Sequence, residues 1–166
     1  VERKTFETYV QAYYFAQVVA LANQRLEQMS GGRFRLIHRR EALDLRSRSG
    51  LELDVFDYYT GKQRPASTLS GGETFMASLS LALGMSDVMQ SSAGGFDIDT
   101  LFVDEGFGSL DADALDQAVA ILEDLGTGSR LIAIISHVAS LRERIPNQIL
   151  LQSGPGGSIL SIMPSV

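Results

Sequence analysis

Two apolar segments of this sequence each lead into polar side chains that suit metal-assisted chemistry. Asp104 and Glu105 directly follow the apolar run 101–103, and His137 is the second residue after the apolar run 131–135. In open α/β sheets, ligands bind at the carboxyl ends of the strands, so these side chains are candidates for one site. The first carboxylate suits a magnesium ion, and the second suits orienting or deprotonating an attacking water, as in Mg-nucleotide chemistry. The alternative is a pair of solvated acids that end a strand.

The segment 69–73, Leu-Ser-Gly-Gly-Glu, could hold a phosphate at the start of a helix. Ser70 and Glu73 have the spacing of a capping box, in which each side chain bonds the backbone amide of the other residue. A capping box does not require the two glycines Gly71 and Gly72. Because they have no side chains, they leave backbone amides open at the positive end of the helix, where an anion is favoured. The residues by themselves leave two interpretations open, a cap alone or a cap that also binds phosphate.

These side chains need a scaffold, and the surrounding pattern predicts a βαβ unit over residues 98–137. The runs 101–103 and 131–135 are short, continuous and apolar, which is typical of buried parallel strands. The helix between them is marked by apolar residues at helical spacing and a glycine just past its end: Leu115, Ala118, Val119, Leu122 and Gly126. A crossover of this kind joins parallel strands of one sheet. The predicted fold class is therefore α/β.

A second helix should follow the Ser-Gly-Gly-Glu segment. It is expected from Gly72 to about Gln90, after a loop over 60–70. Its predicted apolar face consists of Phe75, Leu79, Ala82, Leu83 and Met89. This face should pack on the rest of the protein.

Two pairs of strands are expected outside the βαβ unit. Residues 33–38 and 51–56 should form a small antiparallel pair, because apolar and acidic residues alternate in the second segment. Residues 148–151 and 159–162 should form a hairpin around a turn that contains Gly and Pro.

The N-terminal region predicts a long helix. Residues from about Glu2 to Met29 include no Gly or Pro, and Ser30-Gly31-Gly32 should stop the helix. Steps of three and four residues join Phe6, Tyr9, Tyr13, Ala16 and Ala20. Such a seam fits an ordinary amphipathic helix and the base of a coiled coil equally well.

Composition excludes several classes of protein. The chain has 166 residues, 45% of them hydrophobic, which suits one globular domain with a core. It has no cysteine, so neither disulfides nor cysteine-ligated zinc sites exist. No apolar run approaches the roughly 20 residues of a membrane-spanning helix, so we expect a cytoplasmic protein with no membrane partner.

Charge is distributed unevenly along the chain. The net charge of −6 argues against nucleic-acid binding by the whole surface. Six arginines and only two acids, however, lie in the stretch from Arg33 to Arg48. These arginines either pair with acidic side chains of the same protein or follow the phosphates of DNA.

Four motifs in order resemble the signature motif, Walker B, D-loop and H-loop of ABC-type ATPases. They lie at 69–73, 101–105, 108–111 and 135–137. Within these ATPases, the sequence resembles SbcC, the bacterial relative of SMC-like repair ATPases. The positions that carry this narrower resemblance are Glu73 in the first motif and Gly106 after the second. The resemblance implies that 31–166 is the C-terminal lobe of an ABC ATPase head, a mostly parallel sheet with flanking helices, and that 1–30 is the helix at the base of a coiled coil.

The resemblance also implies roles for individual residues within one head. Asp104 would support the magnesium ion and Glu105 would act as the general base for ATP hydrolysis. His137 would contact the γ-phosphate. The expected cofactors are therefore ATP and Mg²⁺.

Other residues would act on the nucleotide of a second head. Ser70, Gly71 and Gly72, completed by Glu73, would reach the γ-phosphate of a nucleotide that the second head holds. Asp111 would help to join the two active sites. ATP would then hold the dimer of heads together.

A phosphate cradle of the Walker A type is not present in the sequence. That motif reads Gly-x-x-x-x-Gly-Lys-Ser/Thr, and the only Gly-Lys pair, Gly61-Lys62, lacks both the earlier glycine and the following Ser or Thr. The chain alone should therefore not hydrolyse ATP. The resemblance to SbcC implies as partners an N-terminal half of the same head, a second head, an SbcD-like nuclease subunit and DNA, in a complex that processes DNA breaks and hairpins.

Three alternatives remain at this point. The chain could belong to another SMC-type ATPase, such as RecN or a chromosome-condensation subunit. It could be the nucleotide-binding domain of a transporter, although Glu73 and Gly106 disfavour this. It could also be an interaction module that kept the fold and lost the activity, against which Glu105 and His137 argue.

Overall fold

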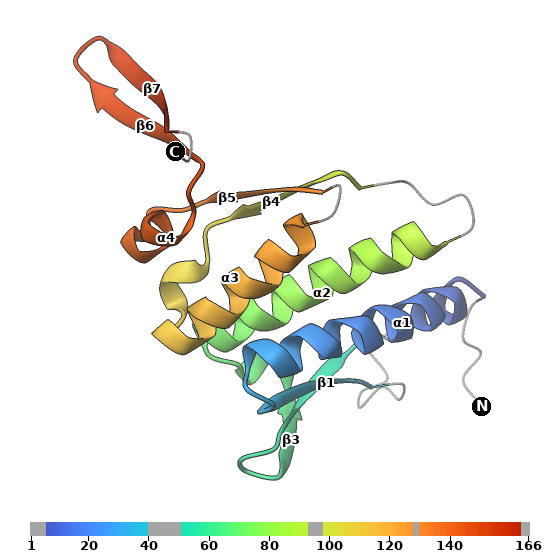
Figure 1. Ribbon diagram of the computed structural model, residues 1–166. Coiled ribbons are helices and arrows are strands. Elements are labelled where there is room, and N and C mark those ends of the chain that lie inside the picture. Colours follow the sequence, from blue (N-terminus) through green and yellow to red (C-terminus); the bar gives the residue numbers. More distant parts are fainter. Residues whose placement is uncertain (1–5, 40–50, 93–97, 128–129, 164–166) are drawn as a thin grey trace.

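A computed structural model describes residues 6–39, 51–92, 98–127 and 130–163 of the chain. Three long helices lie between a lower sheet and an upper strand pair, and a hairpin projects from one end (Figure 1). The elements are α1 (Phe6–Met29), β1 (Phe34–His38), β2 (Leu53–Asp57), β3 (Lys62–Pro65), the 3₁₀ turn η1 (Ala66–Thr68), α2 (Gly71–Ser91), β4 (Thr100–Asp104), the 3₁₀ turn η2 (Phe107–Ser109), α3 (Ala112–Gly126), β5 (Leu131–Ile135), α4 (Ala139–Arg144), β6 (Gln148–Gly154) and β7 (Gly157–Met163).

The predicted βαβ unit is present and the α/β fold class is confirmed. Strands β4 and β5 pair in parallel with Asp104 opposite Ile135, and α3 connects them. The expected apolar face of α3, from Leu115 to Leu122, is buried. In the described part of the chain, β4 and β5 are the parallel pair, and the other two sheets are antiparallel.

The prediction that β4 and β5 are buried strands is wrong for most of their residues. Val103 is buried in the core, but Phe102 is 66% exposed, and Leu131 and Ile135 are also exposed. Side chains alternate between the two faces of a strand, and α3 covers one face of this pair. The other face remains an apolar surface without a cover from the described residues.

Helices α1 and α2 pack together closely at a glycine. A Cβ built on Gly84 would lie 2.6 Å from the backbone oxygen of Val18 and 2.9 Å from the backbone nitrogen of Ala22. Leu79 and Leu83 of the predicted face of α2 are buried, as expected. The prediction is wrong for two members of that face, Ala82 and Met89, which are exposed because the contact with α1 follows the line of Gly84.

The long N-terminal helix is confirmed over its described residues, but only its second half enters the core. Its buried residues begin at Val18 and end at Met29. Phe6, Tyr9 and Tyr13 of the predicted seam are exposed. The N-terminal part of the seam is therefore largely uncovered by the described residues, whereas Ala16 of the same seam is half-buried.

The small antiparallel sheet has three strands where the sequence predicted two. Strand β3 lies within the segment 60–70, which was expected to be a loop, and pairs with β2. Its sequence, Lys-Gln-Arg-Pro, is polar and ends in proline, so it lacks the apolar alternation of a strand. Polar edge strands of this kind are common because they discourage further pairing.

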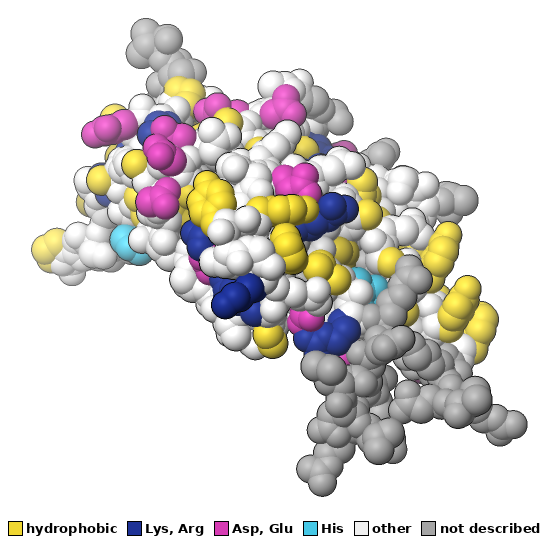
Figure 2. All heavy atoms as spheres, turned by 90° about the horizontal axis from the view of Figure 1, so that it is seen from below, with side chains coloured by type: hydrophobic (Ala, Val, Ile, Leu, Met, Phe, Trp, Pro, Cys, Tyr) yellow, Lys and Arg dark blue, Asp and Glu magenta, His cyan; other side chains and the backbone are white. Residues whose placement is uncertain are grey.

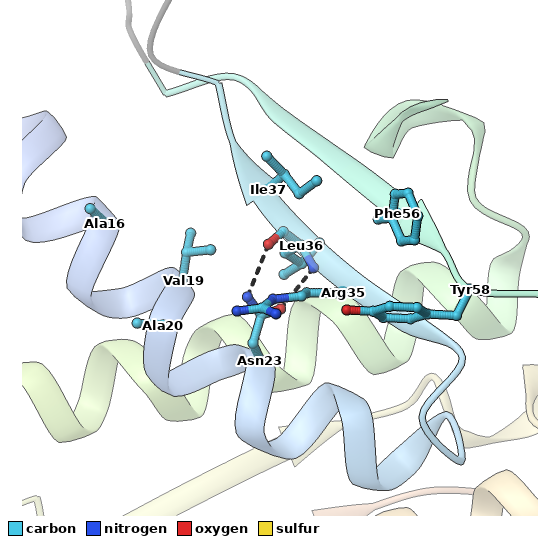
Figure 3. A pocket seen from close by; sticks show the side chains of 9 residues that line it. All are labelled: Ala16, Val19, Ala20, Asn23, Arg35, Leu36, Ile37, Phe56 and Tyr58. Carbon is cyan, nitrogen blue, oxygen red and sulfur yellow. Dashed lines mark hydrogen bonds between the residues drawn. The ribbon is translucent and has the colours of Figure 1, made fainter. Parts of the chain in front are cut away.

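Asn23 of α1 ties the helix to this sheet. Its side-chain amide donates to the Leu36 carbonyl oxygen at 2.9 Å and accepts from the Leu36 backbone nitrogen at 2.7 Å (Figure 3). An open, mostly apolar groove of about 630 Å³ runs beside this contact, between α1 and strands β1 and β2. It holds no cluster of acids or histidines, so the groove is not the candidate for chemistry.

The C-terminal hairpin is confirmed as β6 and β7, and it stands away from the helices (Figure 1). The short helix α4 before it was not predicted. In the described residues, no helix is long and apolar enough to cross a membrane.

Candidate functional site

Glu105 and His137 meet at the carboxyl ends of β4 and β5. Nδ1 of His137 lies 2.9 Å from Oε2 of Glu105 and 3.1 Å from Oε1. The Glu105 amide donates to the Ile135 carbonyl oxygen at 2.8 Å, which extends the strand pairing by one residue. The side chains are 49% and 81% exposed, respectively, so this pair is accessible from solution.

The backbone at Glu105 adopts a conformation that few residues tolerate. Its φ is +58°, and among the described residues it is the one non-glycine with a positive φ. Such a conformation costs roughly 1–2 kcal/mol, and strained residues cluster at functional sites. The chain turns sharply here, because Gly106 also has a positive φ of +96°. The turn ends β4 and carries the Glu105 side chain toward His137.

Asp104 is the last residue of β4, and it is exposed. The described residues hold no group of three or more His, Cys, Asp or Glu side chains that could form a metal cage. Magnesium differs from metals that need such a cage, because it is usually held by one or two carboxylates together with waters and substrate phosphates. The exposed carboxylate of Asp104 therefore fits a magnesium ion that arrives with a nucleotide.

The predicted capping box at the tip of α2 is present. The Ser70 amide donates to Oε2 of Glu73 at 2.9 Å, and the Glu73 amide donates to Oγ of Ser70 at 3.4 Å. Oγ of Ser70 is the acceptor in this bond, which leaves the hydroxyl hydrogen able to point at an anion. Ser70 and Gly71 are exposed at the positive end of a 21-residue helix.

Gly72 has a packing role that the sequence did not reveal. A Cβ at this position would lie 2.5 Å from the backbone oxygen of Ser109, whereas a Cβ on Gly71 would meet Cβ of Ser109 at an ordinary 3.7 Å. The second glycine therefore lets the turn at 107–110, called the D-loop turn after the motif that it resembles, lie directly against the tip of α2. The first glycine has no such steric requirement.

A pair of aromatic rings makes a second link between α2 and the D-loop turn. The rings of Phe75 and Phe107 pack edge to face with their centroids 4.8 Å apart. Phe107 is almost fully buried. Phe107, two residues after Glu105, thus connects the chain segment that carries Glu105 to α2 through this contact. Phe75 was expected only as part of an apolar helix face, and no local signal marks this role.

Asp111 caps the next helix. Oδ1 of Asp111 accepts from the Ala114 amide at 2.8 Å, so one carboxylate oxygen is used to start α3. A hollow of about 700 Å³ lies between the tips of α2 and α3 and the end of α1, and Ser70, Glu73 and Asp111 all line it. Of the predicted site residues, Glu105 contacts His137, and Asp104 precedes Glu105 at the end of β4. Ser70, Gly72 and Glu73 share the hollow with Asp111, whereas Gly71 is not among the residues that line it.

The described arginines of the basic stretch pair with acids of the same chain. Arg33 bonds Asp57, and Arg39 bonds Asp54. Arg35 lies 3.9 Å from Glu27. In the view from below, Lys and Arg side chains are mixed with acidic and apolar ones rather than forming a continuous basic surface (Figure 2).

This pairing agrees with the first of the two interpretations of the stretch for its described residues. Arg40, Arg46 and Arg48 lie outside the described residues. Contact between the stretch and DNA therefore stays a prediction.

Comparison with known proteins identifies the family of the chain. Residues 40–124 match the model of the family described as "SbcC/RAD50-like, Walker B motif". The SbcC subunit of nuclease SbcCD from Staphylococcus epidermidis is 53% identical over 142 residues, which is 86% of this chain and 14% of the relative. The protein of the same name from Treponema pallidum is 50% identical over 153 residues, 92% of this chain and 15% of the relative. The chain thus spans about one seventh of the length of these relatives.

Solved structures with the same fold are SMC heads. A chain described under "Structural biochemistry of ATP-driven dimerization and DNA stimulated activation of SMC ATPases" aligns with a TM-score of 0.71 at 16% identity, covering 94% of this chain and 89% of that one. The Pyrococcus furiosus Smc head bound to the C-terminal domain of ScpA aligns with a TM-score of 0.68 at 16% identity, covering 90% of this chain and 35% of that one. At this identity the likeness concerns the fold.

The sequence matches favour SbcC over the other SMC-type ATPases. The relatives that are about half identical over most of the chain carry the SbcC name, whereas the sequence identity to the SMC structures is 16%. The chain belongs to the SbcC/RAD50-like family, and it carries the region around the Walker B motif of that family.

Proposed function

We propose that the chain is the C-terminal half of an ATP-hydrolysing head, with Glu105 as the group that activates water. The observation that carries the proposal is the contact of Glu105 with His137 at the ends of two adjacent parallel strands. An ionised carboxylate only accepts hydrogen bonds, so Nδ1 of His137 donates to Glu105. This contact holds the imidazole so that its other nitrogen faces away from Glu105, where a phosphate oxygen would lie.

Each of three residues has one task in this proposal. Glu105 accepts a proton from the attacking water, and His137 positions the γ-phosphate. Asp104 would hold a magnesium ion, which would neutralise charge on the phosphates during hydrolysis. The exposed position of all three side chains leaves room for a nucleotide and a water.

The phosphate cradle must come from another segment, which we expect to be the N-terminal half of the same head. Two observations support this. The sequence has no Walker A motif. The face of β4 and β5 that carries Phe102, Leu131 and Ile135 is apolar and exposed. Exposed apolar residues that lie together on one face of a sheet often mark a place where another protein segment packs.

We further propose that the tip of α2 acts on the nucleotide of a second head. Ser70 and Gly71 are exposed, and Asp111 lies on the same hollow as the tip of α2. A phosphate at the positive end of a helix is favoured by the backbone amides there. ATP would then join the two heads, in line with the "ATP-driven dimerization" named for the structural neighbour.

The names of the relatives suggest the larger complex in which the chain would act. Those relatives are named as one subunit of the nuclease SbcCD, so we propose an SbcD-like nuclease subunit and DNA as partners. ATP-driven joining of the heads would then control the nuclease. Helix α1 would be the base of a coiled coil, because Phe6, Tyr9 and Tyr13 stand exposed at helical spacing.

The test is to reconstitute the complete head from this chain and its N-terminal half and to measure ATP hydrolysis. Activity should require both pieces and should disappear in Glu105→Gln, which keeps the size of the side chain but cannot accept a proton from water. ATP binding should survive the substitution. Hydrolysis by Glu105→Gln at the rate of the unchanged head would reject the assigned role, and tight Mg-ATP binding by the chain alone would reject the division of labour.

A further inference from the structure

Glu73 creates an electrostatic problem at the tip of α2. Its carboxylate bonds the Ser70 amide at 2.9 Å, so a negative charge lies within the same turn that should receive an anionic phosphate. A neutral side chain could serve as the second member of the cap equally well, because glutamine also occurs at this position of a capping box. The charge of Glu73 therefore needs an explanation or a compensation.

Two arginines from the small sheet supply the compensation. Nη2 of Arg64 lies 3.3 Å from Oε2 of Glu73, and Nη1 of Arg33 lies 4.0 Å from Oε1. Arg64 stands on β3 and Arg33 directly before β1, so both reach the helix tip from the antiparallel sheet. Each carboxylate oxygen of Glu73 thus has its own guanidinium.

Both arginines are themselves held in place, unlike most surface ion pairs. Nε and Nη2 of Arg33 bond the two oxygens of Asp57 at 3.3 and 3.1 Å, and its guanidinium lies 4.5 Å from the ring centroid of Phe34. Nη1 of Arg64 donates to the carbonyl oxygen of Thr68 at 2.7 Å. Forked, doubly anchored contacts of this type keep their geometry where single exposed pairs do not.

The cluster also connects the tip of α2 to the end of α1. The hydroxyl of Ser30 donates to the Leu26 carbonyl oxygen at 2.6 Å and accepts from the Phe34 amide at 3.1 Å. Arg33 lies within this turn. The position of its guanidinium is therefore set by the helix that precedes it as well as by Asp57.

We infer that Arg33 and Arg64 are positioning residues for phosphate binding at the tip of α2: they offset the charge of Glu73 and keep its carboxylate on the Ser70 amide. The two guanidiniums balance the two carboxylates of Glu73 and Asp57, so the tip presents its amides and the Ser70 hydroxyl without an excess negative charge. This inference rests on the proposed function, in which the tip binds the nucleotide of a second head.

The experiment follows ATP-driven dimerisation of the complete head by light scattering over a range of ATP concentrations. All proteins carry Glu105→Gln to prevent hydrolysis. Arg64→Ala should raise the ATP concentration at half-maximal dimerisation about fivefold or more, because an unbalanced carboxylate then faces the phosphate. Arg64→Lys should restore most of the affinity, since it returns the positive charge.

A double variant separates the charge of Glu73 from its capping bond. Glu73→Gln retains the capping bond to Ser70 and removes the negative charge. In that background Arg64→Ala should change the ATP midpoint less than twofold. An equally large effect of Arg64→Ala with Glu73 and with Gln at position 73 would overturn the inference, because it would show that the arginine does not act through the charge of Glu73.

Arg25→Ala provides a matched control for stability. Arg25 bonds Asp87 at 2.7 Å, a pair between α1 and α2 with similarly limited exposure. Asp87 lies 14 residues beyond Glu73 along α2, about 21 Å at the rise of an α-helix. The control should lower the thermal stability of the head and leave the ATP midpoint unchanged. A midpoint shift in Arg25→Ala as large as that in Arg64→Ala would count against the inference, since general destabilisation would then explain both.

Ser70→Arg separates failure of this inference from failure of the proposed function. A bulky cation at the tip should block dimerisation altogether. A normal ATP-dependent dimer of Ser70→Arg would remove the phosphate role of the tip, and with it the basis of the inference. Loss of the dimer in Ser70→Arg together with an unchanged midpoint in Arg64→Ala would overturn the inference alone.

Discussion

The ring of Phe75 occupies the space that a side chain on Gly106 would need. A Cβ built on Gly106 lies 2.2 Å from Cδ2 of Phe75 and 2.3 Å from its Cε2. The residue next to the candidate general base is thus packed against the helix whose tip should contact the other nucleotide. This relationship makes the turn at Glu105 and Gly106, the D-loop turn and α2 one packed unit.

Gly106→Ala should strongly destabilise the head. The substitution places a methyl group inside the Phe75 ring and forces alanine into a φ of +96°, which together should cost about 2–4 kcal/mol. Thermal unfolding of the complete head should show a Tm lower by roughly 5 °C or more. Gly156→Ala is the control, because a Cβ there meets nothing within 4 Å, and it should leave the Tm nearly unchanged. Equal Tm values for the two variants would contradict the packing.

Gly71→Ala and Gly72→Ala should differ in stability although the two residues are adjacent in the motif. Alanine at 72 collides with the backbone oxygen of Ser109, whereas alanine at 71 makes an ordinary contact. The Tm of the Gly72→Ala head should fall by several degrees, and that of Gly71→Ala should stay within about 2 °C of the unchanged protein. Similar losses in both would mean that the D-loop turn does not lie against the tip of α2 in solution.

His137→Ala should slow ATP hydrolysis by the complete head. The substitution removes both the partner of Glu105 and the proposed contact to the γ-phosphate, and the loss of one such contact typically costs about 100-fold in rate. Steady-state phosphate release measures the effect. Unchanged thermal unfolding would show that the loss is chemical, which is expected because the His137 side chain is largely exposed. A normal rate would remove His137 from the site.

Asp57 should make the stability of the protein depend on acid pH. Hydrogen bonds from Arg33, which outweigh the effect of burial, lower the pKa of the Asp57 carboxyl below its ordinary value. A group with a lowered pKa in the folded state stabilises the protein above its unfolded pKa of about 4, and this contribution is lost as the pH falls through the folded pKa. Asp57→Asn should therefore lose stability less steeply than the unchanged protein when unfolding is measured from about pH 5 downward.

Arg33→Ala tests whether the arginine causes that dependence. Without the guanidinium, the pKa of Asp57 should return toward its ordinary value, and the acid-dependent part of the stability should shrink as it does in Asp57→Asn. An acid dependence that persists in Arg33→Ala would assign the lowered pKa to the backbone donors at Tyr59 and Thr60 instead.

The sequence by itself determined those features whose physical causes are local. The capping box of Ser70 and Glu73 needs only residues three apart, and the apolar face of α3 needs only helical spacing. The order of the motifs indicated the family, and the matches to SbcC relatives confirmed it. The βαβ order also implied that Glu105 and His137 come together, because parallel strands end at the same edge of a sheet.

Tertiary packing decided the features that depend on residues far apart in the chain. Arg64 meets Glu73 only because the polar strand β3 pairs with β2, and nothing in a Lys-Gln-Arg-Pro segment predicts that pairing. The exposure of the aromatic seam of α1 likewise depends on which elements reach it, since the spacing of Phe6, Tyr9 and Tyr13 is the same whether a partner is present or not. Gly72 and Gly106 have the clearest steric reasons, because the oxygen of Ser109 and the ring of Phe75 are brought against them by the folded chain alone.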